Sequence, residues 1–345
     1  MLADHVDHVI GIDPDRYRIT AAVVATDSGG VIDTAEFETT AEGYESLIDW
    51  AVTHTDPDAR AWSIEGAGSY GAGATQWLTG CGEWVLEFDR PTVSTRKDRA
   101  KTDTLDAMRA AREALGRSQL AQPRTGANSQ ALRALTVARD GAQRARVAAI
   151  NELRSLVTTG PIELRDDLRN LTRGALIERC ARLRATGAHA AHKIALTSIA
   201  GRVQALDTEI KHLEHQIRPL VEHAAPLLLD EPGISHITAA QLLIAWSHRG
   251  RFPTEAAFAR LAGVAPIEAS PGQHTRHRLS RGGDRQLNRA IHSIVITRCR
   301  VDPTTRDYLN RRVADGKTPR EARRCLKRYT ARRIYRLLEH PPPTT

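Results

Sequence analysis

A regular spacing of apolar residues between positions 196 and 220 constrains the fold of this chain more than any other feature. Successive members are separated by 3, 4, 3, 4, 3, 4 and 3 residues: Leu196, Ile199, Val203, Leu206, Ile210, Leu213, Ile217 and Leu220. Alternating steps of three and four place an apolar seam along one side of an α-helix, at the a and d positions of a heptad repeat. At 1.5 Å per residue the seam is about 36 Å long, so it needs a long helical partner.

The pattern leaves the partner of this seam open. Glycine and proline are sparse in residues 129–225, and Ser129–Val157 carries a looser stripe of alanine and leucine that suits antiparallel packing within the chain. A second copy of the chain would bury the seam equally well, because a and d patterning does not distinguish the two. We therefore predict a central helical, coiled-coil segment over residues 117–228, which is either a hairpin or a dimerisation arm.

On either side of this central segment, the sequence predicts an α/β domain over residues 1–116 and a mainly helical C-terminal domain over residues 229–345. The predicted fold class is therefore α/β plus α. A meander of three strands followed by alternating helices and strands indicates a mixed sheet and resembles a ribonuclease H-like domain. The predicted strands cover residues 8–13, 17–26, 31–39, 61–65 and 84–88. The predicted helices cover residues 41–54, 70–79, 102–115, 238–246, 255–261, 285–300 and 319–338.

Charge is divided unevenly along the 345 residues, whose net charge is +8. Residues 1–115 hold 10 Lys+Arg and 21 Asp+Glu, a net charge of −11, so the remainder carries +19. Residues 270–336 alone hold 19 basic and 5 acidic residues, a net charge of +14. A basic segment this dense favours a polyanionic partner, above all nucleic acid, over a merely solvated surface.

The sequence also argues against several classes of protein. No apolar run approaches the roughly 18 residues of a membrane span, and residues 1–13 lack the basic and apolar regions of a signal peptide. We therefore expect a cytoplasmic, nucleoid-associated protein without a membrane partner. The cysteines lie far apart, which argues against a zinc ribbon or a disulfide scaffold; they are Cys81, Cys180, Cys299 and Cys325.

Four carboxylates occupy positions that suit a metal site. Asp13 and Glu65 each end a predicted strand, and Asp103 and Asp106 lie in the first turn of a helix for which Thr102 is the expected N-cap. The spacing of three places both aspartates on one face, where the helix dipole offsets part of their charge. Each carboxylate alone also fits a simple turn or helix start. Together they predict a site for Mg²⁺ or Mn²⁺, ions that position phosphodiester oxygens.

A glycine pattern beside Glu65 matches a dinucleotide-binding fingerprint, but in the wrong context. Gly66–Gly71 has the form G-x-G-x-x-G, and Glu87 follows 21 residues after Gly66. The fingerprint belongs after the first strand of a βαβ unit, whereas several predicted strands precede this one. We therefore do not predict a nicotinamide or flavin cofactor.

A loop near residue 270 adds a candidate nucleophile. Ser270 precedes Pro271 and Gly272 at the start of a basic stretch that contains Arg276, Arg278, Arg281 and Arg285. A serine hydroxyl can attack a phosphodiester while guanidinium groups stabilise the charge on phosphorus. The alternative is that Ser270 only shapes a turn. In either case the four arginines are candidate nucleic-acid ligands.

The turn Glu231–Ile234 precedes an apolar helix and resembles a helix-hairpin-helix, whose turn amides contact DNA phosphate. A plain connection between two helices is equally compatible with these residues. The motif by itself therefore leaves both interpretations open.

In combination, these motifs resemble the DEDD transposases of the IS110 insertion-sequence family. They are GID at 11–13, IEGAGSYG at 64–71, KTDTLDA at 101–107, the turn at 231–234, LAGVAPIEASPG at 261–272 and RHRLSRGGDRQLNRAIH at 276–292. The likeness extends over residues 8–338. It rests on the combination of motifs, since each alone is unspecific.

The resemblance implies a RuvC-like N-terminal domain with Asp13, Glu65, Asp103 and Asp106 as a metal-binding tetrad, and a C-terminal serine that links covalently to DNA. It implies element ends and target DNA as substrates, assembly as a homodimer or tetramer and, in some members, a guiding non-coding RNA. The family's serine directly precedes a glycine. Because Pro271 stands there in this chain, we assign the role to Ser270.

Other classes of protein remain as alternatives. One is a RuvC-like, metal-dependent endonuclease that forms no covalent intermediate, and another is a catalytically decayed nucleic-acid-binding protein. An actin-like ATPase or sugar kinase also opens with a G-I-D strand and a hairpin. Such enzymes need further glycine-rich phosphate loops, which the sequence lacks.

Overall fold

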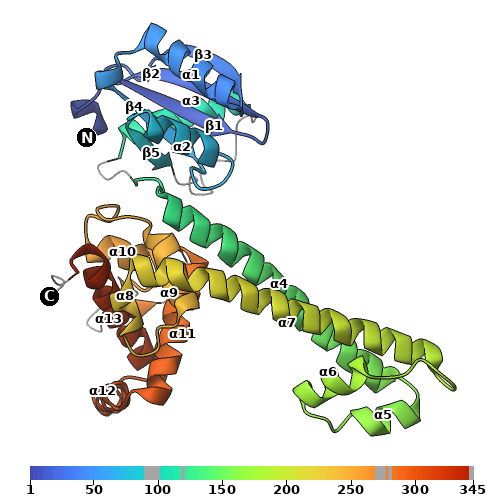
Figure 1. The fold of residues 1–345 in the computed structure, drawn as a ribbon. Coiled ribbons are helices and arrows are strands. Elements are labelled where there is room, and N and C mark those ends of the chain that lie inside the picture. The colour runs from blue at the N-terminus through green and yellow to red at the C-terminus, as the bar shows by residue number, and fades with distance from the viewer. Residues whose placement is uncertain (89–101, 118–120, 269–276, 279–281, 342–345) are drawn as a thin grey trace. The chain divides into compact units, whose positions relative to one another are not determined.

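The computed structural model describes residues 1–88, 102–117, 121–268, 277–278 and 282–341 (Figure 1). They form two compact units: residues 1–126 with 246–253, and residues 127–245 with 254–345. The first contains a mixed sheet covered by helices and the second is mainly helical, which confirms the predicted α/β plus α class. Among the described residues, no helix combines the length and the apolar character that a membrane span requires.

The first unit is built on a five-stranded sheet with the order β3-β2-β1-β4-β5. The strands are β1 (His8–Pro14), β2 (Arg18–Ala25), β3 (Val31–Glu38), β4 (Arg60–Glu65) and β5 (Val85–Phe88). β1 to β3 form an antiparallel meander, β4 pairs parallel with β1, and β5 pairs parallel with β4. All five strand predictions are confirmed.

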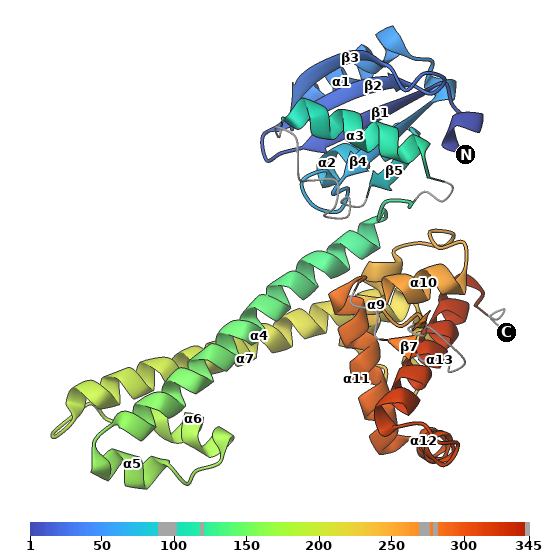
Figure 2. The same cartoon turned by 180° about the vertical axis from the view of Figure 1, so that it is seen from behind.

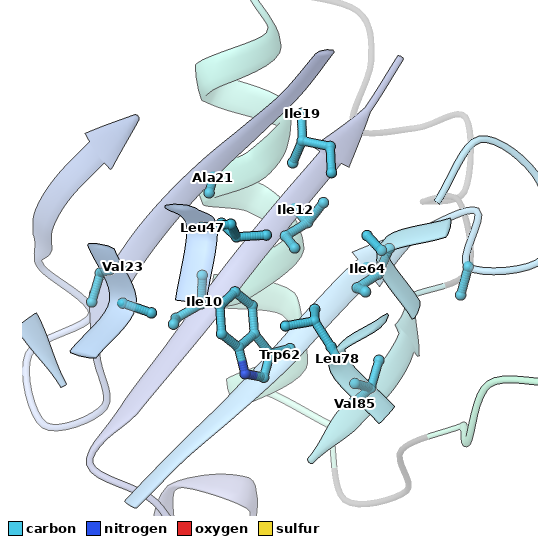
Figure 3. Packing of buried hydrophobic residues seen from close by; sticks show 13 residues of the cluster. Ile10, Ile12, Ile19, Ala21, Val23, Leu47, Trp62, Ile64, Leu78 and Val85 are labelled. Atoms are coloured by element: carbon cyan, nitrogen blue, oxygen red, sulfur yellow. The ribbon is translucent and has the colours of Figure 1, made fainter. Parts of the chain in front are cut away.

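Helices cover both faces of this sheet. α1 (Ala41–His54) and α2 (Ala72–Gly80) pack on one face (Figure 1), and α3 (Asp103–Leu115) packs on the other (Figure 2). Side chains alternate along each strand, so each face has its own apolar core. The core under α1 and α2 is centred on Ile10, Ile12, Leu47, Trp62 and Leu78 (Figure 3). The core under α3 contains Val9, Val24, Ala61, Leu86, Ala111 and Ala114.

Gly11 marks the closest approach of α3 to the sheet. A Cβ at this position would lie 1.9 Å from the carbonyl oxygen of Ala107 and 2.7 Å from the amide nitrogen of Ala111. Towards its end α3 contributes Ala114 to the buried cluster that holds Val9, at the beginning of β1. α3 therefore runs antiparallel to β1 and begins at the edge of the sheet where β1 and β4 end (Figure 2).

A segment from later in the chain, Trp246–Pro253, belongs to this first unit. Its residue Arg251 is buried, with an Nη2 hydrogen bond to Glu87 (3.1 Å) and an Nε hydrogen bond to the carbonyl of Gln122 (3.0 Å). Glu87, the acidic residue of the fingerprint-like pattern, thus takes part in a structural ion pair.

The second unit begins with two long helices that lie side by side, α4 (Ala127–Thr159) and α7 (Ala190–Ala224) (Figures 1 and 2). Three ion pairs join them: Arg139–Glu214, Arg146–Asp207 and Glu152–Arg202. The residue numbers rise along α4 while those of the partners fall along α7, so the two helices are antiparallel. The seam therefore has a partner in the same chain, the segment that contains Ser129–Val157, which is one of the two arrangements that the sequence left open.

The seam on α7 is unevenly buried by this partner. One column is buried: Leu196, Val203, Ile210 and Ile217. In the other column, Ile199 is buried but Leu206, Leu213 and Leu220 remain half-buried. At the end of the hairpin where α4 ends and α7 begins, α5 (Ile162–Leu168) and α6 (Arg173–Ala181), which the sequence did not predict, close a core around Leu153, Leu168 and Cys180.

The remaining helices are α8 (Pro226–Leu229), α9 (His236–Trp246), α10 (Glu255–Leu261), α11 (Arg285–Val301), α12 (Pro303–Ala314) and α13 (Pro319–Glu339). The last helix, α13, packs against α8, α10, α11 and α12. Strands β6 (Ile267–Glu268) and β7 (His277–Arg278) pair antiparallel. The predictions for α9, α10, α11 and α13 are confirmed, whereas α12 was missed.

The turn at 231–234 is held by protein contacts. Gly233 has φ +83°, and a Cβ there would lie 2.8 Å from the carbonyl oxygen of Ile294 in α11. Glu231 pairs with Arg298 (3.8 Å) and accepts a hydrogen bond from Arg333 (2.8 Å). Because α8, the helix before the turn, has only four residues, the described residues do not show a helix-hairpin-helix pair.

Candidate functional site

Asp13 and Glu65 end neighbouring strands at one edge of the sheet. The parallel register of β1 and β4 carries them to the same level. Two residues earlier on each strand, Gly11 packs against α3, and the Ser63 hydroxyl donates to the carbonyl of Ala110 in α3 (2.8 Å). Since side chains alternate along a strand, both carboxylates lie on the face of the sheet that α3 covers.

The first turn of α3 brings two more carboxylates to this edge. Thr102 is the N-cap, and its hydroxyl accepts a hydrogen bond from a backbone amide of the first turn, which confirms the prediction. Asp103 is exposed, and Asp106 is half-buried and paired with Arg109 (2.7 Å). α3 begins where β1 and β4 end (Figure 2), so the strand register and the start of α3 place all four predicted carboxylates at one edge. We call this the carboxylate edge.

The donors of the carboxylate edge fit a hard divalent cation in chemical kind, because all four are carboxylates and such ions prefer oxygen ligands. In the part of the chain that the structure describes, no three side chains from His, Cys, Asp and Glu stand close enough to hold a metal ion. Arg109, which the sequence did not single out, neutralises Asp106 in this arrangement.

The β1–β2 turn borders the carboxylate edge, and its exposed residues include Arg16 and Tyr17. Thr39 fixes this turn, since its hydroxyl donates to the carbonyl of Arg16 (3.0 Å) and its amide donates to the carbonyl of Tyr17 (3.1 Å). The Arg16 guanidinium lies over the Tyr17 ring, 5.1 Å from its centroid. An aromatic residue in the turn directly after the Asp13 strand is the signal that would have pointed to this feature.

The loop 66–71 lies beside that turn. Gly66 has φ +62°, and its carbonyl accepts a hydrogen bond from the amide of Gly71 (3.3 Å). A Cβ at Gly71 would lie 3.2 Å from the Pro14 side chain. The positive φ of Gly66 and the close packing of Gly71 account for these two glycines without a dinucleotide. The Tyr70 side chain in this loop is exposed.

The structure describes only the two ends of the predicted serine loop and Arg278 within it. Ser270, Arg276 and Arg281 lie outside the described residues. The backbone of Arg278 pairs with Ile267 through β7 and β6. Arg285 is the first residue of α11 and is exposed.

Ion pairs divide the basic residues of the C-terminal helices into two groups. Several arginines pair with carboxylates of this unit: Arg298 with Glu231 and Asp302, Arg328 and Arg332 with Glu255, and Arg333 with Glu231. These guanidinium groups are therefore partly neutralised within the protein.

A second group has no carboxylate partner in the described part of the chain. Arg285, Arg289 and His292 are spaced along one face of α11. Partial burial lowers the pKa of His292, and the positive charges of Lys327 and Arg323 on α13 lower it further. Burial likewise lowers the pKa of Lys327. We call these five residues the α11–α13 cationic face.

Comparisons with known proteins bear on both units. A transposase family model of the DEDD IS110 type matches residues 10–160, which include the carboxylate edge. A second model, described as the transposase IS116/IS110/IS902 family, matches residues 225–310, which include the serine loop and Arg285.

Two curated relatives are similar to part of the chain. The insertion element IS110 uncharacterized 43.6 kDa protein of Streptomyces coelicolor is 38% identical over 133 residues, 37% of this chain and 33% of the relative. The insertion element IS900 uncharacterized 42 kDa protein of Mycobacterium paratuberculosis is 30% identical over 156 residues, 43% of this chain and 39% of the relative. The matches thus span well under half of these relatives. Together with the two family models, they show that the chain belongs to the IS110 family of insertion-sequence transposases.

Proposed function

We propose that this chain is a DNA transposase that cuts and rejoins strands at the ends and target of an insertion sequence. The observation that carries the proposal is the convergence of Asp13, Glu65, Asp103 and Asp106, from two strands and a helix start, on one edge of a sheet. The strand order β3-β2-β1-β4-β5, a meander followed by parallel strands, supports a ribonuclease H-like, RuvC-like domain.

The carboxylate edge would hold Mg²⁺ or Mn²⁺. When bound, such ions neutralise charge on a phosphodiester and activate an attacking oxygen. The chain itself supplies the position of the four carboxylates and their charge balance. Arg109 pairs with Asp106 and so reduces repulsion among four like charges at one edge.

In the C-terminal unit we assign the nucleophile to Ser270. Its Oγ would form a bond to phosphorus while the bond to the leaving DNA oxygen breaks, and that oxygen would take up the serine proton. A hydroxyl of a second DNA end would then displace the serine and rejoin the strands. The arginines that follow Ser270 in the sequence supply positive charge for this step.

A covalent-adduct assay tests this assignment and separates it from the nuclease alternative. On a suicide substrate that traps the cleaved strand, we expect the unsubstituted chain to give a protein–DNA adduct and Ser270→Ala to give none. Ser280→Ala, a serine of the same basic stretch, is the matched control and should keep the adduct. An adduct that survives Ser270→Ala would move the nucleophile elsewhere. Cleavage without any adduct would favour the RuvC-like endonuclease.

The partners in this proposal are DNA, an element-encoded guide RNA and further copies of the chain in a homodimer or tetramer. The assembly would act in the cytoplasm, at the nucleoid. The half-buried column on α7, Leu206, Leu213 and Leu220, supports assembly because it leaves apolar surface along the hairpin for another coiled-coil strand. The α11–α13 cationic face supports binding to a phosphate backbone, since Arg285, Arg289 and Arg323 have no carboxylate partner among the described residues.

Removing two charges from this face should weaken DNA binding in a salt-dependent way. For Arg285→Ala with Arg289→Ala, we expect the slope of log binding constant against log salt to fall by about 2, because each phosphate contact contributes about 0.9. Fluorescence anisotropy over a salt series measures this slope.

The matched control for this double variant is Arg169→Ala with Arg202→Ala. It removes the same charge from exposed arginines of the same unit that already pair with Asp166 and Glu152. An equal loss of slope in both double variants would mean that net charge, and not the α11–α13 cationic face, determines binding.

A further inference from the structure

Two tyrosines that no step of the proposed function uses lie exposed at the carboxylate edge. Aromatic residues make up only 4% of the chain. The Tyr17 side chain is 67% exposed and the Tyr70 side chain 63% exposed. One is carried by the turn after β1 and the other by the loop after β4, so the two tyrosines follow Asp13 and Glu65 on adjacent strands.

The backbone of each tyrosine is held in place although its ring is exposed. In the β1–β2 turn, Thr39 donates hydrogen bonds to the backbone carbonyls of Arg16 and Tyr17. In the neighbouring loop, Ser69 and Gly71 on either side of Tyr70 donate to the carbonyl of Gly66 (2.7 and 3.3 Å). The contact between Gly71 and Pro14 connects the loop to the turn. The two rings therefore project from fixed backbone positions, so binding a flat ligand needs no ordering of the loop backbone.

We propose that Tyr17 and Tyr70 are stacking platforms for unpaired nucleobases of the DNA on which the carboxylate edge acts. The proposal rests on the proposed function and adds the form of the substrate, a duplex with locally separated strands. Aromatic rings can stack on a base only after it has left the helical stack, and such stacking accepts every base. The Arg16 guanidinium, which lies over the Tyr17 ring, adds a positive charge beside the DNA strand that carries the stacked base.

Binding of two DNA probes tests the proposal without any cleavage. The probes are a labelled duplex with a central unpaired bubble and the same duplex fully paired, measured by anisotropy with the full chain carrying Asp13→Asn. We expect Tyr17→Ala and Tyr70→Ala each to weaken binding of the bubble about tenfold and to leave the paired duplex unchanged. Phenylalanine at either position should restore binding, because stacking needs the ring and not the hydroxyl.

Trp84→Ala is the matched control, since Trp84 is an exposed aromatic residue of the same unit (43%) that precedes β5, at the opposite end of the sheet. It should leave both probes unaffected. Three results would each overturn the proposal. The alanine variants could lose equal affinity for the two probes, or the phenylalanine variants could bind the bubble as weakly as the alanine variants. The tyrosines could also prove necessary for binding single-stranded RNA and not for binding the bubble. If instead the unsubstituted chain fails to cleave DNA while the tyrosine-dependent preference for the bubble persists, only the proposed function is lost.

Discussion

Replacing Asp13 by asparagine is expected to lower DNA strand cleavage at least about a hundredfold, the usual effect of losing one preorganised charge-stabilising group, while DNA binding persists. The substitution keeps the size of the side chain and removes the charge at the end of β1, beside Glu65 on the parallel neighbour. A neutral amide is a weaker ligand than a carboxylate for a hard divalent cation. Cleavage of an element-end substrate in Mg²⁺, followed on gels, measures the loss, and anisotropy measures binding.

Asp15→Asn provides the matched control, because Asp15 is an exposed carboxylate two residues after Asp13, in the β1–β2 turn. The same change of charge there should leave cleavage within about threefold, because two unit charges about 7 Å apart in water interact by only about 0.6 kcal/mol. Unchanged cleavage by Asp13→Asn would remove Asp13 from the metal site. A parallel loss of DNA binding would point to general damage to the first unit.

Replacing Gly11 by alanine is expected to destabilise the first unit by about 3 kcal/mol or more, at or beyond the upper end of the usual cost of overpacking. The added methyl group would lie 1.9 Å from the carbonyl oxygen of Ala107 and 2.7 Å from the amide nitrogen of Ala111. Both are backbone atoms of α3, so no side-chain rotation relieves the clash and α3 has to move. Urea unfolding followed by tryptophan fluorescence reports the change, because all five tryptophans of the chain, buried Trp62 among them, belong to the first unit.

Gly80→Ala is the comparison for this variant, since nothing lies within 4 Å of a Cβ at the exposed end of α2. It should be neutral, or stabilising by up to about 1 kcal/mol through helix propensity. If the two variants unfold at the same urea concentration, α3 does not lie against Gly11. Because α3 also carries Asp103 and Asp106, we expect Gly11→Ala to lose cleavage as well.

The strands, most of the helices and the four carboxylates were predictable because their signals are local. The alternation of side chains along β1 and β4 depends on neighbouring residues, as does the apolar spacing of three and four along α7. Thr102 likewise caps α3 through a hydrogen bond within the first turn of that helix. α5, α6 and α12 were missed because they are short or strongly polar and have weak periodicity. The placement of Ser270 is not described, so its role stays a prediction.

The sequence by itself determined the five strands of the main sheet and most of the helices, which residues carry charge and which four carboxylates lie at strand ends or a helix start. Only the tertiary structure decided that α4 is the partner of α7 and that Gly11 and Gly71 serve close packing. It also decided which basic residues of α11 and α13 have no carboxylate partner within the described ranges. Periodicity depends on residues a few positions apart, whereas these outcomes depend on contacts between residues far apart in the chain, such as Gly11 with Ala107. No local pattern records such contacts, and they bring Asp103 and Asp106 to the edge where Asp13 and Glu65 lie.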